Sequence, residues 1–371
     1  MRVSGSVKVL ARALLCAAWA ALAAGCGGGS APVTIAAVGN WDGPEERALR
    51  QGIELAVLGI NGAGGVNGRE LRIVFRDDHN DNDSAARVAA ELVADPAVLA
   101  VIGHTRSDPT LVAAKVYDGV MPVITARFTS PDVSGLSRWV FQLVPTDSAY
   151  SAAVIRFAAS REWRTAALVF NNTARGRATA EQFKLQFPGE VLSMDPAAFP
   201  QPLPGDMRTF VQFHRSEQPD LVFLPIGAER APDYIRAAQE ERLGAAVIGW
   251  DVWASVTCDS TLPGEFYRLI PFDLAADRPE TRGFAEVFQA RYSAAPDPFA
   301  ALGYDAVGLI GRAARSCRSR SCIRDAIAAL SPRDPYPGVI GPLSFAADGT
   351  AIGPEPVVVA LTRRARSSRG T

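Results

Sequence analysis

Two stretches, VLAVIGHTRS (residues 98–107) and PVITARFTS (residues 122–130), each run from a short apolar segment into a polar loop that carries hydroxyl groups. An apolar run of this length between helical patterns predicts a parallel strand that is buried on both faces. Each loop would then follow the carboxyl end of its strand, where open α/β sheets hold ligands. The loops offer hydroxyls, backbone N–H groups and arginines but no evident nucleophile–base pair. The sequence therefore predicts a binding protein with no catalytic residues.

The alternation of apolar strands and amphipathic helices continues along most of the chain, which at 371 residues is too long for one ordinary core. Such alternation predicts a parallel sheet with helices on both faces, and it occurs once before and once after residue 145. We therefore expect two Rossmann-like α/β lobes. The expected strands are 33–38, 71–76, 98–103, 122–124, 166–170, 221–224, 246–249 and 266–270, and the expected helices are 44–60, 84–94, 109–117, 147–160, 177–186, 207–215, 232–241, 282–292 and 299–315.

The chain is expected to pass between the two lobes three times, near Val144, Phe272 and Gly338. Helices 282–292 and 299–315 have no strand between them and are placed on the first lobe, whereas 339–345 and 356–361 are placed on the second. Three crossings predict a hinge with a closable cleft. The predicted layout is a signal peptide (1–25), a flexible tether (26–32), a first lobe (33–144 plus 275–337), a second lobe (145–274 plus 338–362) and a disordered tail (363–371).

The first residues have the pattern of a secretory signal, in which basic residues precede an apolar segment, 13–24, that is too short to span a bilayer. This segment leads into LAAGC (residues 22–26), which resembles a bacterial lipobox, so Cys26 is the predicted lipidation site. The glycines and serine at 27–30 would form a flexible tether. An ordinary signal peptide that ends near a cysteine is the alternative. We expect an exported protein with a lipid anchor on the cell envelope.

Charge and cysteine content narrow the possible functions further. The net charge is −1, and a nucleic-acid-binding surface would need a basic excess. Export implies an oxidising compartment, in which Cys317 and Cys322 are close enough in sequence to form a disulfide, while Cys258 has no partner. The three histidines are scattered without the spacing of metal ligands. We therefore expect no metal, no cofactor and no nucleic-acid partner.

Five short segments occur in an order that resembles a known family. They are INGAGGVNGR (60–69), VIGH (101–104) with Ser107, VI (123–124) with TSP (129–131), IGWD (248–251), and GPLSF (341–345) with DG (348–349). Together they resemble the Leu/Ile/Val-binding type of periplasmic substrate-binding protein, which serves ABC transporters. The resemblance implies a two-lobed receptor that captures an amino acid or a related small carboxylate and delivers it to an ABC permease, without enzymatic activity.

The resemblance also implies roles for individual residues. Ser107 and the N–H groups at the start of the following helix would bind the ligand carboxylate, since a helix N-terminus favours an anion. Thr129 and the carbonyl near Arg127 would accept hydrogen bonds from the ammonium group, and Asp251 would supply its counter-charge from the second lobe. The structural alternatives are that Ser107 caps its helix, that Thr129 starts a turn, and that Asp251 caps the segment after its strand.

Three tryptophans also follow predicted strands. Trp41 and Trp250 are candidates for an apolar or stacking wall of the ligand site. For Trp253, packing in the core is an equal alternative.

Three arginines depart from the pattern of the leucine-binding members. Arg106 stands where a disulfide cysteine can occur, Arg127 stands where those members have a small residue, and Arg175 replaces an aromatic residue before a glycine. Guanidinium groups bind carboxylates through paired hydrogen bonds. We therefore hypothesise that the ligand is more polar or more acidic than leucine. The alternative is that Arg106 and Arg127 pair with Asp108 and Asp132 or point to solvent.

Other functions find less support. The glycines at 62–68 could suggest a dinucleotide fingerprint, but that motif follows a strand and opens a helix, whereas this stretch follows a predicted helix and precedes a strand. Neither G-x-S-x-G nor H-E-x-x-H occurs in the chain, so hydrolase signatures are missing. A lipoprotein of the same fold that acts as a regulatory or signalling interaction module is the remaining alternative.

Overall fold

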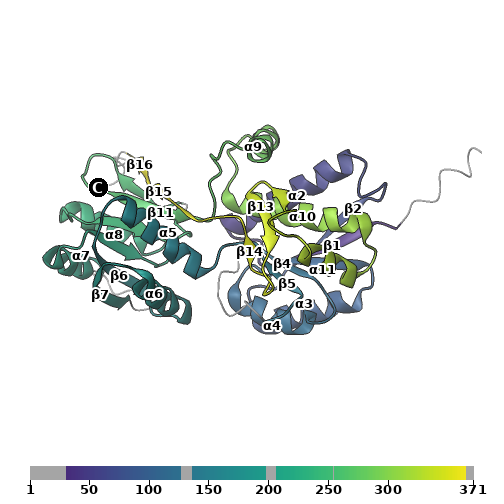
Figure 1. Cartoon of the computed structure of the whole chain (residues 1–371), viewed down its shortest axis with the longest axis horizontal. Coiled ribbons are helices and arrows are strands. Elements are labelled where there is room, and N and C mark those ends of the chain that lie inside the picture. Colours follow the sequence, from purple (N-terminus) through teal and green to yellow (C-terminus); the bar gives the residue numbers. More distant parts are fainter. Residues whose placement is uncertain (1–30, 127–135, 198–205, 254, 365–371) are drawn as a thin grey trace, which may run out of the picture.

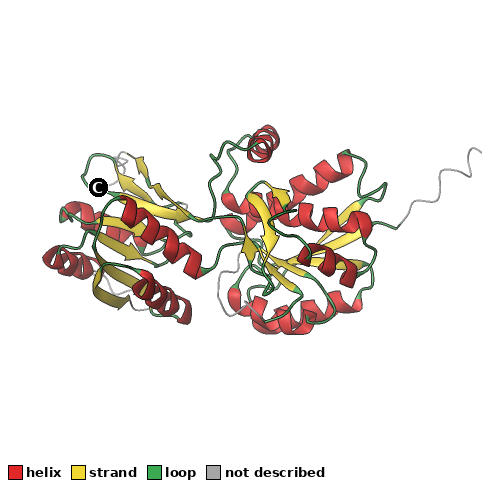
Figure 2. Ribbon diagram, in the orientation of Figure 1, coloured by secondary structure: helices red, strands yellow, loops and turns green. Residues whose placement is uncertain are grey.

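The computed structural model describes residues 31–126, 136–197, 206–253 and 255–364, which form two α/β lobes (Figures 1 and 2). The predicted pair of lobes with parallel sheets is confirmed. Cys26, the signal peptide, Arg127 and Thr129 lie outside the described residues. Among the described helices, none combines the length with the apolar content that a membrane span requires.

The first lobe is built on a five-stranded sheet in the order β2-β1-β3-β4-β5, and all of its strand pairs are parallel. The side chains of the interior strand β1 alternate between two cores. Ile35 and Ala37 belong to the core under α2 and α10, whereas Ala36 and Val38 belong to the core under α3 and α4. The strands are β1 (Val33–Val38), β2 (Leu71–Arg76), β3 (Val98–Gly103), β4 (Val123–Thr125) and β5 (Val140–Gln142). The helices are α2 (Pro44–Gly62), α3 (Asn82–Ala94), α4 (Ser107–Tyr117), α9 (Pro279–Tyr292), α10 (Pro298–Ser316) and α11 (Arg320–Ala328).

The second lobe is built on a six-stranded sheet in the order β15-β11-β9-β8-β6-β7, in which only the edge strand β15 is antiparallel. The strands are β6 (Thr165–Asn171), β7 (Glu190–Ala197), β8 (Leu221–Leu224), β9 (Ala246–Gly249), β11 (Phe266–Ile270) and β15 (Val357–Ala360). The helices are α5 (Asp147–Ser160), α6 (Ala174–Gln186), α7 (Asp206–Glu217) and α8 (Ala231–Glu240). A short pair, β10 (Thr257–Asp259) and β16 (Thr362–Arg364), lies beside this sheet. Residues 363 and 364 therefore belong to a strand and not to the predicted disordered tail.

The described chain passes between the lobes three times, after β5, after β11 and after β14 (Ala351–Ile352). Figure 1 shows the last of these passages as the yellow segment between β14 and β15. The expected position of the third crossing, near Gly338, is wrong. The hairpin of β12 (Tyr336–Gly338) and β13 (Gly341–Phe345) continues into β14, and its apolar residues pack in the core of the first lobe. The carboxylate of Asp305 in α10 fixes this hairpin, since it accepts hydrogen bonds of 2.9 Å from the N–H groups of Val339 and Ile340.

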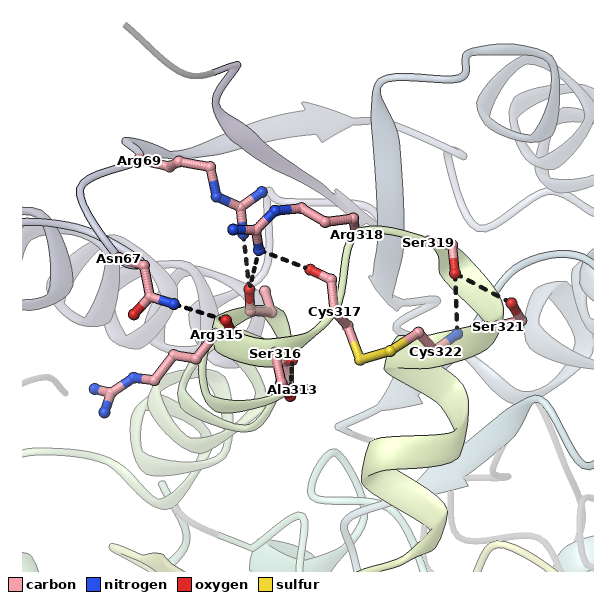
Figure 3. The surroundings of a disulfide bond; sticks show 11 residues. Asn67, Arg69, Ala313, Arg315, Ser316, Cys317, Arg318, Ser319, Ser321 and Cys322 are labelled. Atoms are coloured by element: carbon pink, nitrogen blue, oxygen red, sulfur yellow. Dashed lines mark hydrogen bonds between the residues drawn. A yellow bond between two sulfur atoms is a disulfide. The ribbon is translucent and has the colours of Figure 1, made fainter.

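A disulfide links α10 to α11 in the first lobe. Cys317 and Cys322 form it with their Cα atoms 5.3 Å apart, whereas Cys258 is a buried free cysteine in the second lobe. Figure 3 shows that the loop between the bridged cysteines lies beside Arg69, whose guanidinium donates to the carbonyl of Ala314 at 2.7 Å. The end of α10 is thus tied both to α11 and to the turn that precedes β2.

Candidate ligand-binding site

The carboxyl edges of both sheets lie on the side of the interlobe crossings. The first crossing leaves the carboxyl end of β5 and enters α5, which leads into the amino end of β6. The start of α5 therefore lies at the carboxyl edge of the second sheet. The second crossing leaves from the carboxyl end of β11, which is parallel to β9. The loops that follow the parallel strands of each lobe are consequently placed toward the hinge, where α/β sheets hold ligands.

In the first lobe, β3 ends at a position that only glycine fits. Gly103 has a φ of +133°, and a Cβ there would come within 2.2 Å of the carbonyl oxygen of Val38 in β1. Thr105, two residues after Gly103, is buried, and its hydroxyl accepts a hydrogen bond of 3.3 Å from the N–H of Asn40. The loops after β1 and β3 are therefore held together at this edge of the sheet.

Ser107 is the first residue of α4, two residues earlier than the predicted helix start, and it is partly exposed. The N-cap is Arg106, which makes no side-chain capping hydrogen bond, so the alternative that Ser107 caps the helix is wrong. The carbonyl of Arg106 accepts from the N–H of Thr110, while Pro109 has no N–H. The N–H groups of Ser107 and Asp108, in the first turn, have no acceptor within the helix. A hydroxyl and these N–H groups are suited to binding an anion.

A buried histidine–aspartate pair lies directly behind this loop. His104 Nδ1 is 2.5 Å from Asp78 Oδ2, and both side chains are fully buried. His104 Nε2 lies 3.4 Å from the hydroxyl of Tyr117, whose pKa is raised by burial, so the phenol stays protonated. Asp78 Oδ1 also accepts a hydrogen bond of 3.0 Å from the N–H of Asn80. The pair joins the loop after β2 to the loop that carries Ser107.

Sequence reasoning missed this pair because its members are 26 residues apart and belong to different loops. The available signal was that each of them follows an apolar strand directly or after one residue.

Trp41 lies after β1 and packs on the first lobe. Its indole N–H donates to the carbonyl of Arg76 at 2.9 Å, and its ring meets Phe75 edge-on with centroids 5.1 Å apart. The side chain is half-buried, so part of the ring stays accessible at the carboxyl edge. Trp41 can therefore offer an apolar surface to a ligand but not its N–H group.

In the second lobe, a cavity of about 150 Å³ lies at the carboxyl edge between the ends of β6, β8 and β9. Thr173, which caps α6 by accepting from the N–H of Gly176 at 3.1 Å, lines this cavity together with Asn171 and Thr179. Asn171 Oδ1 and Thr179 Oγ1 are buried, and neither has a hydrogen-bond partner in the described part of the chain. Buried polar atoms without partners call for an explanation, and a polar ligand group would satisfy them. The cavity is smaller than a whole ligand site, so its size fits a subsite.

Trp250 and Trp253 lie deeper than expected for a ligand wall. Trp250 is 4% exposed and packs on Tyr150 and Phe223 with centroid distances of 5.4 and 5.7 Å, although it also lines the 150 Å³ cavity. Trp253 is fully buried and donates its indole N–H to the carbonyl of Ile226 at 2.9 Å. It therefore packs in the core, which was the alternative to a place in the wall of the ligand site. Asp251 follows Trp250 at the same edge of the sheet and is half-buried.

The arginines that are expected to favour a polar or acidic ligand differ in what the structure describes of them. Arg106 is exposed at the start of α4, and it forms no ion pair with Asp108 among the described side chains. Arg175 is the second residue of α6, but its side chain is not among those described. The glycine that follows it, Gly176, is required by packing, since a Cβ would come within 2.0 Å of the carbonyl oxygen of Asn171.

No group of three or more His, Cys, Asp or Glu side chains in the described residues is arranged to hold a metal ion. The candidate site thus has a helix start suited to an anion and an exposed arginine on the first lobe, with a carboxylate and a polar cavity on the second.

Comparison with known proteins gives a family match over most of the chain. A family model described as periplasmic binding protein matches residues 32–363. A segment of 159 residues, 41% of this chain, is 31% identical to 42% of the leucine-, isoleucine-, valine-, threonine-, and alanine-binding protein of Pseudomonas aeruginosa. A segment of 107 residues, 28% of this chain, is 36% identical to 29% of the Leu/Ile/Val-binding protein of Escherichia coli K12. The aligned segments therefore span less than half the length of these curated relatives.

Solved structures share the fold over nearly their whole length. An ABC transporter substrate-binding protein from Desulfitobacterium hafniense in complex with Leu has a TM-score of 0.79 and 22% identity, covering 89% of this chain and 98% of that chain. LivJ from Streptococcus pneumoniae in complex with isoleucine has a TM-score of 0.74 and 21% identity, covering 89% and 99%. A solute binding protein from R. palustris in complex with benzoate has a TM-score of 0.72 and 19% identity, covering 92% and 99%. At these identities the likeness establishes the fold.

Proposed function

Because this chain belongs to the periplasmic binding protein family, we propose that it is an extracytoplasmic receptor for an amino acid or a related small carboxylate, which it delivers to an ABC permease. The observation that carries the proposal is the placement of Ser107 and Asp251. Ser107 opens α4 at the carboxyl edge of the first sheet, and Asp251 follows β9 at the carboxyl edge of the second. Both edges lie on the side of the interlobe crossings.

The carboxylate end of the ligand has the better-supported partner. The hydroxyl of Ser107 and the N–H groups of the first turn of α4 bind it, and a charge-assisted hydrogen bond contributes roughly 1.5–3 kcal/mol. The relatives with bound ligands support a carboxylate, since leucine, isoleucine and benzoate all carry one. Benzoate has no ammonium group, so the acceptors for that group decide whether this protein takes an amino acid.

Asp251 and Thr129 are the proposed ammonium acceptors. Ser107 and Asp251 lie on different lobes, so a ligand held first by Ser107 meets Asp251 only when the hinge closes. Binding then stabilises the closed arrangement by the free energy of the added contacts.

The ligand is proposed to be more polar or more acidic than leucine. The cavity beside Trp250 would receive its side chain, because Asn171 Oδ1 and Thr179 Oγ1 are buried there without partners in the described residues. Arg106, and by sequence Arg127 and Arg175, would attract an acidic group. Trp41 would cover the apolar part of the ligand.

The protein is also proposed to be a lipoprotein anchored through Cys26, on the sequence pattern alone. Expression of the full chain and of Cys26→Ser in a bacterial host, followed by membrane fractionation, tests this part. Recovery of the wild-type protein in the membrane and of the variant in the soluble fraction is expected. Equal fractionation of the two proteins would contradict the anchor but not the binding function.

Isothermal titration calorimetry tests the binding function with matched sets of ligands. Each set contains an L-amino acid, its deaminated acid and its decarboxylated amine, for leucine, glutamine and glutamate. We expect the amines to fail, because they lack the carboxylate, and glutamine or glutamate to bind more tightly than leucine. Tight binding of leucine with no response to the polar amino acids would contradict the proposed ligand class. No response to any solute would favour the interaction-module alternative.

A further inference from the structure

A second cavity lies in the first lobe, away from the candidate ligand site. It has a volume of about 410 Å³ and is enclosed by the end of α2, the following turn, the second half of α10 and β12. Because α2 starts after the carboxyl end of β1 and runs back along the sheet, its last residues lie near the amino ends of the strands. The volume is within the range of sites for small organic ligands.

Apolar and aromatic side chains and two glycines of α10 form part of the lining of this cavity. Ile60, Tyr304 and Tyr336 line it. Along α10 the lining includes Gly308 and Gly311, which have no side chains to fill the space. At Gly308 a Cβ would come within 1.9 Å of the Tyr336 hydroxyl, so the present position of that tyrosine requires glycine. The geometry leaves room for an apolar group beside two aromatic rings.

Two hydroxyl groups at the cavity are donors that lack protein acceptors. Among the described residues, the hydroxyls of Tyr304 and Tyr336 take part in no hydrogen bond, and burial raises the pKa of both. They therefore remain protonated and can donate to a ligand. A ligand acceptor would satisfy them.

The charge at the rim is positive. Arg312 already donates to Asp334 Oδ1 and to the carbonyl of Pro335, each at 3.2 Å. The guanidinium of Arg315 donates to no acceptor in the described part of the chain, and Figure 3 draws no hydrogen bond from it. The amide of Asn67 holds the backbone at this position by donating to the carbonyl of Arg315 at 2.6 Å. No Asp or Glu is among the residues that line the cavity in the described structure.

We propose that this cavity is a second ligand site, which binds a small carboxylate with an aromatic or branched apolar body. The carboxylate contacts Arg315, and the body packs between Ile60 and the two tyrosines. The proposal rests on the cavity and its charge and does not depend on the proposed transport function.

Nuclear magnetic resonance of the ¹⁵N-labelled protein tests the site with phenylacetate and its uncharged analogue phenylacetamide. We expect saturable shifts of the Gly308 and Gly311 amides with phenylacetate and roughly tenfold weaker binding of phenylacetamide, which corresponds to the loss of one charge-assisted contact. Arg315→Gln should remove this preference for the charged probe. Arg87→Gln, which alters an exposed arginine on α3, is the matched control and should preserve it.

Ser107→Ala separates the two sites, because it should leave the shifts of Gly308 and Gly311 unchanged even where it weakens binding between the lobes. Three outcomes would overturn the proposal. The first is equal affinity for both probes, and the second is the absence of a saturable shift at the two glycines at millimolar phenylacetate. The third is a shift that depends on protein concentration and accompanies a change in molecular size, which would indicate a second copy of the chain on this face.

Discussion

His104 Nδ1 lies 2.5 Å from Asp78 Oδ2 in the interior of the first lobe, and the contact joins two loops that border the proposed carboxylate site. Removing one partner of a buried pair leaves the other polar group without its acceptor. Asp78→Ala should therefore lower the free energy of unfolding by about 3 kcal/mol. Urea denaturation followed by circular dichroism measures this change.

Asp77 provides the control for that variant. It precedes Asp78, but it pairs with His79 at the surface, where both side chains are exposed. Asp77→Ala should cost less than about 1 kcal/mol. Similar losses for the two alanine variants would show that the buried pair is not what stabilises the loops.

Asp251→Asn and Ser107→Ala should separate the two ends of the ligand. Asp251→Asn should weaken binding of an amino acid roughly 10- to 100-fold, while affecting its deaminated analogue little, because only the amino acid has an ammonium group. Ser107→Ala should weaken both ligands alike, since both have the carboxylate. Calorimetry measures each affinity, and Asp233→Asn, at an exposed site in the same lobe, is the control. Equal losses of both ligands in Asp251→Asn would contradict its ammonium role.

Burial of His214 should make the second lobe sensitive to acid. The side chain is fully buried with Nδ1 2.7 Å from the Tyr234 hydroxyl, and burial lowers its pKa to about 4. Between about pH 6.5 and pH 4 the unfolded chain binds a proton that the folded protein excludes. The free energy of unfolding should then fall by about 1.4 kcal/mol for each pH unit in this window, and this loss is absent above pH 6.5.

His214→Asn isolates that contribution, because asparagine places a polar atom near the position of Nδ1 but does not titrate. Denaturation at pH 7, 6 and 5 should show a shallower decline for the variant than for the wild type. The comparison is needed because burial also raises the pKa of the neighbouring Asp195. The raised pKa of Asp195 increases the free energy of unfolding as the pH falls, which opposes the effect of His214. Parallel curves for the two proteins would contradict the assignment.

The disulfide between Cys317 and Cys322 should contribute roughly 2 kcal/mol, because the loop that it closes is short and the entropy removed from the unfolded chain is small. Cys317→Ser/Cys322→Ser should lower the free energy of unfolding by this amount in urea. Cys258→Ser keeps the disulfide and should respond to reductant as the wild type does. An unchanged midpoint of the wild type after full reduction would contradict the prediction.

Arg320, inside the disulfide loop, should stabilise the end of α3. Its guanidinium donates to the carbonyls of Val98 at 2.8 Å, Val93 at 2.9 Å and Leu92 at 3.3 Å, and also to that of Asp95. Lysine keeps the charge but cannot reach these acceptors together, so Arg320→Lys should cost about 2 kcal/mol. Arg282→Lys, at an exposed arginine on α9, should cost less than about 1 kcal/mol in the same assay.

The sequence predicted the strands and helices that are apolar and periodic, and it failed where these signals are weak. The edge strand β7 was missed because most of its residues are only partly buried, so it has no continuous apolar run. The helix α4 was expected to start at Pro109, but it starts at Ser107, since the extended backbone of Arg106 supplies the N-cap without a capping side chain.

The position of the third crossing was wrong for a different reason. Leu343 and Phe345 are apolar residues that would suit the core of either lobe. The hairpin that carries them is held on the first lobe by hydrogen bonds from the N–H groups of Val339 and Ile340 to the carboxylate of Asp305. Asp305 is more than 30 residues away from both of these residues in sequence. Long-range contacts of this kind leave no periodic signal.

The sequence predicted which loops carry the candidate site residues, but it did not predict how deeply each side chain is buried or what it contacts. Ser107, Asp251 and Trp41 do lie at carboxyl edges of the sheets, as parallel strands require. Trp250 lies largely in the core, because the rings of Tyr150 and Phe223 cover it, and no pattern around Trp250 indicates those neighbours.

The antiparallel edge strand β15 has a consequence for how the protein matures during synthesis. The first lobe needs the chain as far as β14 to complete its hairpin sheet, and the second lobe then needs β15 to cover β11. A nascent chain that has emerged only to the end of α11 can finish neither lobe, and its β11 would be a bare sheet edge open to pairing with other chains. Both halves of the molecule are therefore completed together, by its last segment, and a chain cut short before β15 is expected to aggregate.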